Sequence, residues 1–181
     1  MGATLNLNTA GTGRAPAAGF TLVELIALLV ITGILAAIAV PAVSGTFTSA
    51  RATSAANLVV RDLTYARERA LNTGLRTWAS FSITSNSYTL LGEPAGSAGR
   101  ANATTLDDPA TGAPYTQRIG QLFPSVRLTV AGFDAGSEVG FDWLGRPLNS
   151  TASSLLSDGQ ITISLSTTVT VRTGSGLAST P

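Results

Sequence analysis

Hydrophobic residues follow three successive patterns along this chain. Residues 1–18 are small and polar without periodicity, which is typical of a disordered leader. Residues 25–43 are uncharged and almost continuously apolar, whereas residues 52–70 repeat apolar side chains every three or four positions. From Leu75 onward the apolar repeat shortens to two. We therefore expect one long helix from about residue 22 to about residue 72, followed by short β-strands.

The second half of the predicted helix carries a stripe of small apolar residues, which would let a sheet approach it closely. The stripe consists of Ala52, Ala55, Ala56, Val59, Leu63, Ala66 and Ala70. Asn72-Thr73-Gly74 is a typical helix end, because glycine readily takes the left-handed conformation found after a helix C-terminus.

The alternating segments predict an all-antiparallel β region. The expected strands are 75–83, 88–91, 117–122, 126–130, 138–143, 160–165 and 168–172. Residues 92–116 are rich in Gly, Ala, Pro and Asp and predict a long irregular loop, and residues 173–181 a polar tail. One helix followed only by strands predicts an α+β fold in which the helix packs on an antiparallel sheet.

The apolar segment 20–43 is long enough to cross a membrane. Its roughly 24 residues would form a helix of about 36 Å, against about 30 Å of bilayer hydrocarbon. Glu24 lies just inside the start of this segment. An acidic side chain in a membrane helix is costly, by about 2.5–3.5 kcal/mol when it lies at the bilayer centre. A residue held at such a cost is expected to be functional.

The segment is open to three interpretations. A secretory signal peptide would be cut at the small residues Ala37-Ile38-Ala39 and would release a secreted binding domain or enzyme that begins near Val40. Signal peptides have apolar cores of about 7–15 residues, however, and this run is longer and contains Glu24. A plain transmembrane anchor accounts for the length but not for Glu24.

The third interpretation rests on the motif Gly19-Phe20-Thr21-Leu22-Val23-Glu24 and the long apolar helix after it. This combination resembles the processing site of type IV pilins and of the pseudopilins of type II secretion systems. The resemblance implies that a prepilin peptidase cuts after Gly19 and methylates the new amino terminus at Phe20. It also implies that Glu24 neutralises the Phe20 amine of a neighbouring subunit during assembly. Pairing removes much of the cost of two lone charges at low dielectric.

Two later stretches resemble the GspH/FimT class of minor pseudopilins: the helix end from Arg67 to Gly74, and Phe141-Asp142-Trp143-Leu144-Gly145-Arg146-Pro147 before a hairpin. The implied organisation is a leader (1–19), a transmembrane and filament-core helix (20–43), its amphipathic continuation (44–72) and a periplasmic β-rich domain (73–181). The implied partners are other pilins, the prepilin peptidase and the assembly platform of the inner membrane. A minor type IV pilin for pilus assembly or DNA uptake is the alternative within this family.

Charge argues against a large nucleic-acid interface. The net charge is +1, and only 12% of residues are charged, compared with about 25% in ordinary soluble domains. Arg61, Tyr65 and Arg69 share one helix face with Arg76 shortly after, and these arginines form a possible DNA contact. Because Asp62 and Glu68 dilute the patch, a solvated helix face is the favoured interpretation.

Composition also limits catalysis. The chain has no Cys and no His, which removes the usual zinc ligands, the thiol nucleophile and the Ser-His-Asp triad. We therefore expect no enzyme activity, no cofactor and no metal. Asp134, Glu138 and Asp142 are spaced as calcium ligands might be, but surface charge is the favoured interpretation. Trp78 and Trp143 are expected on the packed face of the sheet or at its rim.

Overall fold

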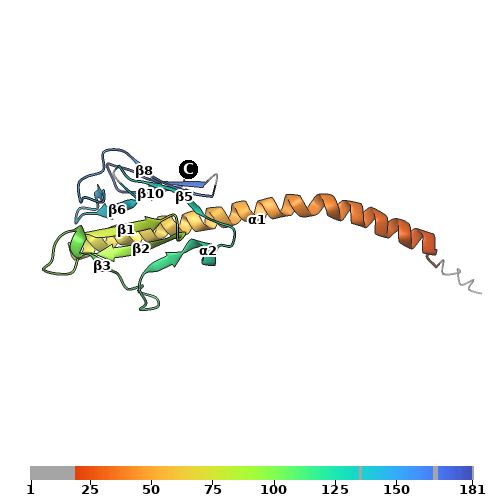
Figure 1. Cartoon of the computed structure of the whole chain (residues 1–181), viewed down its shortest axis with the longest axis horizontal. Coiled ribbons are helices and arrows are strands. Elements are labelled where there is room, and N and C mark those ends of the chain that lie inside the picture. The colour runs from red at the N-terminus through yellow and green to blue at the C-terminus, as the bar shows by residue number, and fades with distance from the viewer. Residues whose placement is uncertain (1–18, 135, 165–166, 181) are drawn as a thin grey trace, which may run out of the picture. The chain divides into compact units, whose positions relative to one another are not determined.

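The computed structural model describes residues 19–134, 136–164 and 167–180; for residues 39–45 it describes the backbone but not the side chains. Two compact units, Met1–Val43 and Ser44–Pro181, make up the chain. Helix α1 (Leu22–Thr73) begins in the first unit and ends in the second, and Figure 1 shows its last turns beside the strands of the second unit. The predicted long N-terminal helix is confirmed.

Helix α1 ends where the sequence predicts. Gly74 takes a positive φ of 71°, and its N–H donates a 3.0 Å hydrogen bond to the carbonyl of Ala70. The hydroxyl of Thr73 donates to the carbonyl of Arg69 at 2.7 Å. These contacts satisfy carbonyls of the last turn that have no partner within the helix.

The larger sheet lies against α1 and is antiparallel throughout. It has the order β3-β2-β1-β6-β7, and β4 pairs with the other end of β2. Its strands are β1 (Thr77–Ser82), β2 (Ser87–Gly92), β3 (Thr104–Thr105), β4 (Thr116–Arg118), β6 (Glu138–Phe141) and β7 (Pro147–Leu148). The β1–β2 hairpin pairs Ser82 with Ser87 and Thr77 with Gly92, so this predicted hairpin is confirmed.

A second, smaller antiparallel sheet has the order β10-β9-β8-β5. Its strands are β5 (Leu128–Gly132), β8 (Gly159–Ile163), β9 (Thr167–Val171) and β10 (Ala178–Ser179). The structure therefore contains two sheets where the sequence pattern predicts one, because an alternating pattern identifies strands but not their partners.

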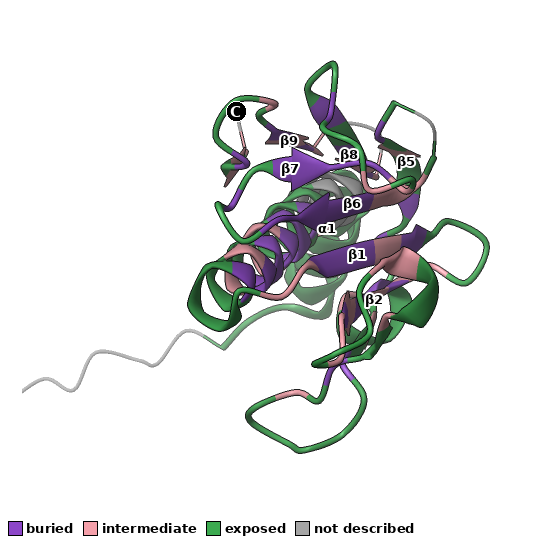
Figure 2. Ribbon diagram, turned by 90° about the vertical axis from the view of Figure 1, so that its left-hand side faces the viewer, coloured by how far each residue is buried: buried purple, intermediate pink, exposed green. Residues whose placement is uncertain are grey.

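The core forms between the small-residue stripe of α1 and the two sheets. All seven residues of the predicted stripe are buried, with exposed fractions of 2% or less, and Figure 2 shows this buried face of α1 beside the buried strands β1 and β6. The ring of Phe81 in β1 lies 5.3 Å from that of Tyr88 in β2 and 5.9 Å from that of Phe133, which follows β5. These aromatic contacts join the two sheets.

Three local predictions were wrong. Residues 117–122 were expected as one strand, but β4 stops at Arg118 and is followed by the short helix α2 (Ile119–Leu122). Since β2 begins at Ser87 and Ser87 pairs with Arg118, the next residue has no strand to pair with. The expected loop 92–116 contains β3 and the 3-10 helix η1 (Arg100–Asn102), and the expected polar tail contributes β10.

Candidate functional site

The start of α1 is fixed by a local cap. The N–H of Glu24 donates to the hydroxyl oxygen of Thr21 at 3.3 Å, and the N–H of Leu25 donates to the Thr21 carbonyl at 3.1 Å. Thr21 is thus the N-cap, and Glu24 lies in the first turn, where a carboxylate favourably faces the positive end of the helix dipole. Thr21-Leu22-Val23-Glu24 also has the spacing of a capping box, a signal that the sequence analysis missed.

The predicted cleavage site lies directly before this cap. Gly19 and Phe20 are exposed and precede the first helical residue. Cleavage after Gly19 and methylation at Phe20 stay predictions, as does the assembly role of Glu24. The predicted leader, 1–19, falls outside the described residues except for Gly19.

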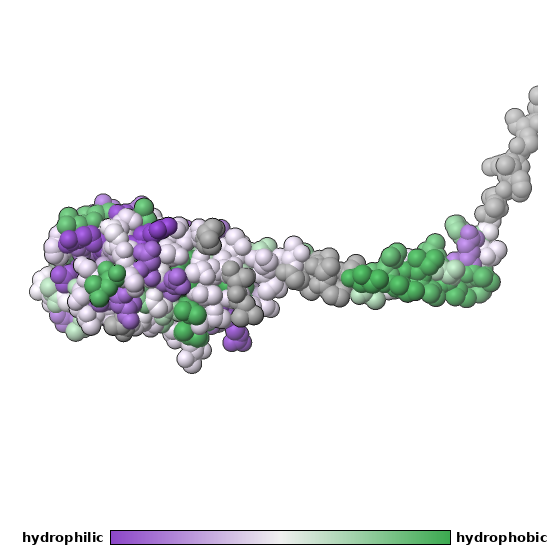
Figure 3. Space-filling view, turned by 90° about the horizontal axis from the view of Figure 1, so that it is seen from above, coloured by the Kyte–Doolittle hydropathy of each residue, from purple (hydrophilic) through white to green (hydrophobic). Residues whose placement is uncertain are grey.

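Large apolar side chains are exposed on every side of the first part of α1. Their exposed fractions lie between 53% and 75%, and Figure 3 shows hydrophobic atoms over this segment. They belong to Phe20, Leu22, Val23, Leu25, Ile26, Leu28, Leu29, Val30, Ile31, Ile34, Leu35 and Ile38. A helix that is apolar on all sides is typically buried in a protein core or a membrane. We call residues 20–38 the apolar segment.

Beyond Glu24, the one hydroxyl group of the apolar segment is satisfied within the helix. Thr32 is the one hydroxyl residue between Glu24 and Ile38, and it donates to the carbonyls of Leu28 and Leu29 at 2.8 and 3.0 Å. The neighbouring Gly33 faces open space, since a Cβ added there would meet no atom within 4 Å. Beyond Glu24, the segment can therefore enter an apolar environment without burying an unpaired side-chain donor.

Within the described part of the chain, no helix combines the length and hydropathy that crossing a membrane requires. The predicted span 20–43 includes residues 39–43, whose side chains lie outside the described residues.

The arginines of the possible DNA contact have different surroundings. Arg61 bonds its neighbour Asp62 at 3.0 Å, which raises the pKa of the Arg61 guanidinium. Arg76 lies 3.9 Å from Glu93 and 5.4 Å from the ring centre of Trp143. Among the described residues, Arg69 has no ion pair. Two of the three charges are thus locally balanced, which leaves little positive field for a phosphate backbone.

A buried carboxylate is the feature that sequence reasoning missed. Asp62 has no exposed surface, and its second oxygen accepts a 2.7 Å hydrogen bond from the hydroxyl of Tyr88. Burial and then the negative charge of Asp62 raise the pKa of Tyr88. The signal was present, because Asp62 follows Val59 by three positions and precedes Ala66 by four, on the apolar stripe.

The three carboxylates considered for calcium each have their own partners. Asp134 accepts from the N–H of Leu156 at 2.6 Å and from the hydroxyl of Ser157 at 2.7 Å. Glu138 pairs with Arg100 through two bonds of 2.7 and 2.8 Å. Within the described ranges, no three acidic side chains are grouped in a way that could hold a metal.

Asp142 closes the loop between β6 and β7. Burial raises the pKa of its carboxyl, but hydrogen bonds from the Arg146 N–H, the Arg146 guanidinium and the Leu144 N–H outweigh this and lower it. The Nε of Arg67 donates to the Gly145 carbonyl of this loop at 3.0 Å. The two later stretches that resemble minor pseudopilins therefore touch each other.

Both tryptophans lie at the larger sheet. Trp78 is fully buried in β1, with Arg100 6.0 Å from its ring centre. Among the described residues, none serves as a hydrogen-bond partner for its indole N–H. Trp143 is 48% exposed and stacks beside Arg76. These positions agree with the predicted packed face and rim.

Comparison with solved structures identifies the fold. The chain is similar to two structures of the minor pseudopilin EpsH from the type 2 secretion system of Vibrio cholerae. The TM-scores are 0.51 and 0.52 at 12% and 11% identity, and the alignments cover 72% of this chain and 96% and 92% of those chains. No protein-family model and no curated protein sequence matches the chain. The chain has a pseudopilin-like fold.

Proposed function

We propose that this chain is a minor pseudopilin, a structural subunit of a type II secretion pseudopilus with no chemistry of its own. It would be inserted in the inner membrane with residues 73–181 in the periplasm. Prepilin peptidase would cut it after Gly19 and methylate Phe20, and the assembly platform would add it to a short filament of other pseudopilins.

The observation that carries this proposal is the exposed apolar segment, which begins within the motif from Gly19 to Glu24 and continues beyond it. A dozen large apolar side chains in water are unfavourable by about 25 cal/mol per Å² of their apolar surface. Packing against the same segment of neighbouring subunits, or against lipid, would remove that surface from water. The pseudopilin-like fold of the remaining chain supports the filament over a plain anchor.

Glu24 has a defined part in this proposal. Its carboxylate could remain in the membrane interior or the filament core at low cost only if a cation met it, and the Phe20 amine that cleavage creates is such a cation. A pair formed between subunits would offset much of the desolvation cost of both charges. Assembly would thus depend on cleavage, because the uncut chain has no amine at Phe20.

The mass of the mature N-terminus, measured in a cell that carries a type II secretion system, tests the processing step. We expect a chain that begins at methylated Phe20. A chain that begins near Val40 would instead establish a cleaved signal peptide and would contradict the proposal. An uncut chain would indicate a plain membrane anchor.

Glu24→Ala tests the assembly step separately. We expect cleavage after Gly19 to continue while incorporation into sheared or cross-linked filaments falls at least about tenfold, the equivalent of about 1.4 kcal/mol. Thr21→Ala is the control, since it truncates an exposed side chain beside the first turn, keeps the charge of Glu24 and leaves the apolar side chains in place. Normal incorporation of Glu24→Ala would remove the proposed role of Glu24.

A further inference from the structure

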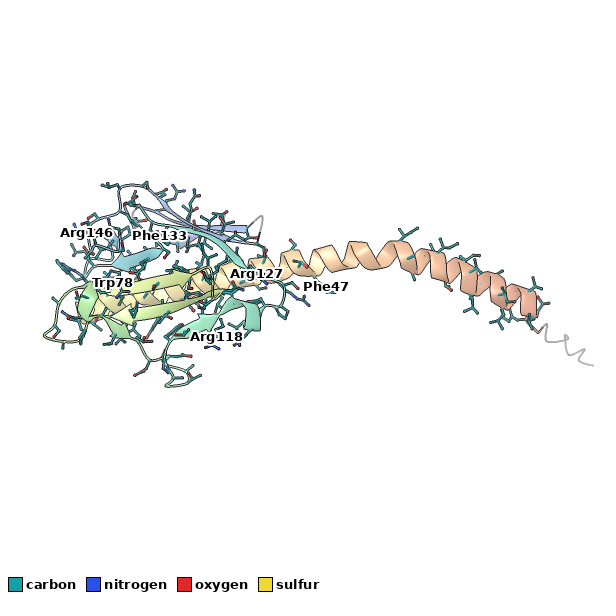
Figure 4. All side chains as sticks on the ribbon, viewed as in Figure 1. Phe47, Trp78, Arg118, Arg127, Phe133 and Arg146 are labelled. Carbon is teal, nitrogen blue, oxygen red and sulfur yellow. The ribbon has the colours of Figure 1, made fainter. Side chains whose placement is uncertain are left out.

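Arginines and exposed apolar side chains gather at one end of the Ser44–Pro181 unit. In Figure 4, Phe47 and Arg127 lie at the end of this unit where its part of α1 begins, with Arg118 on the strand-and-helix segment below. Arg51 follows Phe47 by one helical turn and so shares its face of α1. We call Phe47, Arg51, Arg118, Leu122 and Arg127 the basic end.

One residue, Asn86, holds the backbone beside two of these arginines through its side chain and its main-chain carbonyl. Asn86, in the turn between β1 and β2, donates to the carbonyl of Val126 at 2.9 Å and accepts from the N–H of Leu128 at 2.8 Å. Its own carbonyl accepts from the N–H of Ile119 at 2.9 Å. The residues on both sides of Arg127 and the residue after Arg118 are therefore held against the same turn.

The two chain segments that form the basic end carry no opposing charge. Residues 44–60 and 109–133 contain no Asp and no Glu. Arg51, Arg118 and Arg127 are all exposed. Among the described residues, none of these three arginines forms an ion pair, although five other arginines do. The positive charge here is therefore available to a partner.

Apolar side chains lie among these charges. Phe47 is 57% exposed and Leu122 is 52% exposed. Arg118, Gln121 and Leu122 line one open hollow of about 480 Å³, so a guanidinium and an apolar side chain face the same space. Basic residues together with exposed aromatic and aliphatic side chains are typical of surfaces that lie at a membrane interface.

We propose that the basic end docks on the anionic headgroups of a lipid bilayer, with the arginines on phosphate groups and with Phe47 and Leu122 in the interface. One guanidinium group can donate two parallel hydrogen bonds to two oxygens of the same phosphate. Chain continuity favours a bilayer over other polyanions, since Arg51 is the first charged residue after Glu24 and residues 25–38 of the apolar segment lie between them in the same helix. Nucleic acid would meet the arginines but would leave Phe47 and Leu122 in water.

The experiment uses the full chain in lipid nanodiscs. Because the chain has no Cys, Ser54→Cys places a single fluorophore one turn beyond Arg51, and quenchers on lipid headgroups report its proximity to the bilayer. Ala95→Cys is the distal probe, since it follows β2 at the end opposite the Ser87–Arg118 pair. Discs of phosphatidylcholine alone are compared with discs that also contain phosphatidylglycerol.

We expect quenching at Ser54→Cys to be at least about twofold stronger in the anionic discs, and quenching at Ala95→Cys to be the same in both. Raising the salt from about 0.1 M to about 1 M shortens the Debye length from about 10 Å to about 3 Å and should abolish the difference. The double variant Arg118→Gln with Arg127→Gln should also abolish the difference in quenching between the two kinds of disc. The control double variant, Arg69→Gln with Arg172→Gln, removes the same amount of charge elsewhere and should keep this difference.

Equal quenching in the two kinds of disc, or a difference that survives high salt, would overturn the docking proposal alone. Retardation of duplex DNA that depends on Arg118 and Arg127, without any lipid effect, would replace it with a nucleic-acid surface. Loss of the full chain from both kinds of disc would overturn the proposed membrane insertion as well, so failures of the two proposals are distinguishable.

Discussion

The hydroxyl of Tyr88 in β2 donates a 2.7 Å hydrogen bond to the carboxylate of Asp62 in α1, and both residues are buried, with exposed fractions of 1% and 0%. This contact ties the helix to the larger sheet by a charge-assisted bond in a dry environment. Arg61, whose side chain is 68% exposed, provides the balancing positive charge at the edge of the core.

Tyr88→Phe should lower the free energy of unfolding by about 1.5–3 kcal/mol, the range for hydrogen bonds to charged groups. The physical reason is that the variant leaves a buried oxygen of Asp62 without its donor. Urea unfolding followed by tryptophan fluorescence measures the change. Tyr65→Phe is the control, since Tyr65 stacks on Tyr115 at 5.6 Å and the same hydroxyl is removed. A loss under about 0.5 kcal/mol in Tyr88→Phe would contradict the role of the bond.

Acid should destabilise the protein partly through Glu138. The two hydrogen bonds from Arg100 lower the pKa of Glu138 against a smaller opposing effect of burial. A carboxyl with a lowered pKa in the folded state contributes stability above its ordinary pKa of about 4.3, and this contribution is lost as pH falls through the lowered value.

The midpoint of urea unfolding, measured at several pH values between about 6 and about 3, reports this loss of stability. This pH range brackets the ordinary pKa of Glu. Glu138→Gln should be less stable than the parent chain at pH 6 and should lose less stability on acidification. The exposed Glu68 is the control position, and Glu68→Gln should keep the parent slope. If Glu138→Gln also kept the slope of stability against pH that the parent chain has, the ion pair between Arg100 and Glu138 would not contribute to acid sensitivity.

Gly176 should not tolerate a side chain. Its φ is +65°, and an added Cβ would lie 2.5 Å from the carbonyl oxygen of Gly145. Gly176→Ala should therefore lower the free energy of unfolding by more than about 1–2 kcal/mol, the cost of the left-handed conformation alone. Gly174→Ala is the matched control, because a Cβ there meets no atom within 4 Å. Equal unfolding free energies for the two variants would contradict the predicted clash.

The close approach at Gly176 also predicts where local order is lost. The Nε of Arg67 donates to the carbonyls of Gly145 and Ser175 at 3.0 and 3.2 Å. In Gly176→Ala, hydrogen exchange should accelerate in the loops 142–146 and 173–177 before it does so in the β1–β2 hairpin. Uniform acceleration over the whole unit would indicate a global effect instead.

Glu24→Gln separates the two roles open to Glu24. Glutamine can replace glutamate in a capping box, so a purely local cap would survive the change, whereas a charge pair with the Phe20 amine would not. We expect Glu24→Gln to be incorporated into filaments as poorly as Glu24→Ala. Thr21→Ala weakens the cap by about 1 kcal/mol but keeps the charge, and should be incorporated well. Incorporation restored by Gln would assign Glu24 to the cap alone.

The sequence predicted the elements whose signals are local. The apolar stripe and Gly74 located the end of α1, and the alternating segments located the β1–β2 hairpin, because each of these depends on neighbouring residues only. The partition of the strands into two sheets was not predictable in this way, since it is decided by contacts such as that of Phe81 with Phe133 between distant parts of the chain.

The sequence supplies the motif of the candidate site, whose roles stay predictions, but not the surroundings of the motif. The order of Gly19, Phe20 and Glu24 alone predicts a processing and assembly site, whereas the charge of Asp62 indicates a surface position. Only the fold shows that its partner is Tyr88, which lies 26 positions away. Likewise, Arg118 and Arg127 are unremarkable in the sequence, and it is Asn86 that brings their backbones to one turn.

The hydrogen bonds of the Thr32 hydroxyl within its own helix affect how selectively this helix can bind a partner. Since it bonds carbonyls of its own helix, residues 25–38 present no polar group that a neighbouring helix would have to align with. Such a surface gains contact energy at many rotational settings and with many apolar neighbours. If the chain assembles through this helix, as we propose, we expect the helix to supply the strength of the contact and Glu24, together with the folded unit Ser44–Pro181, to supply its selectivity.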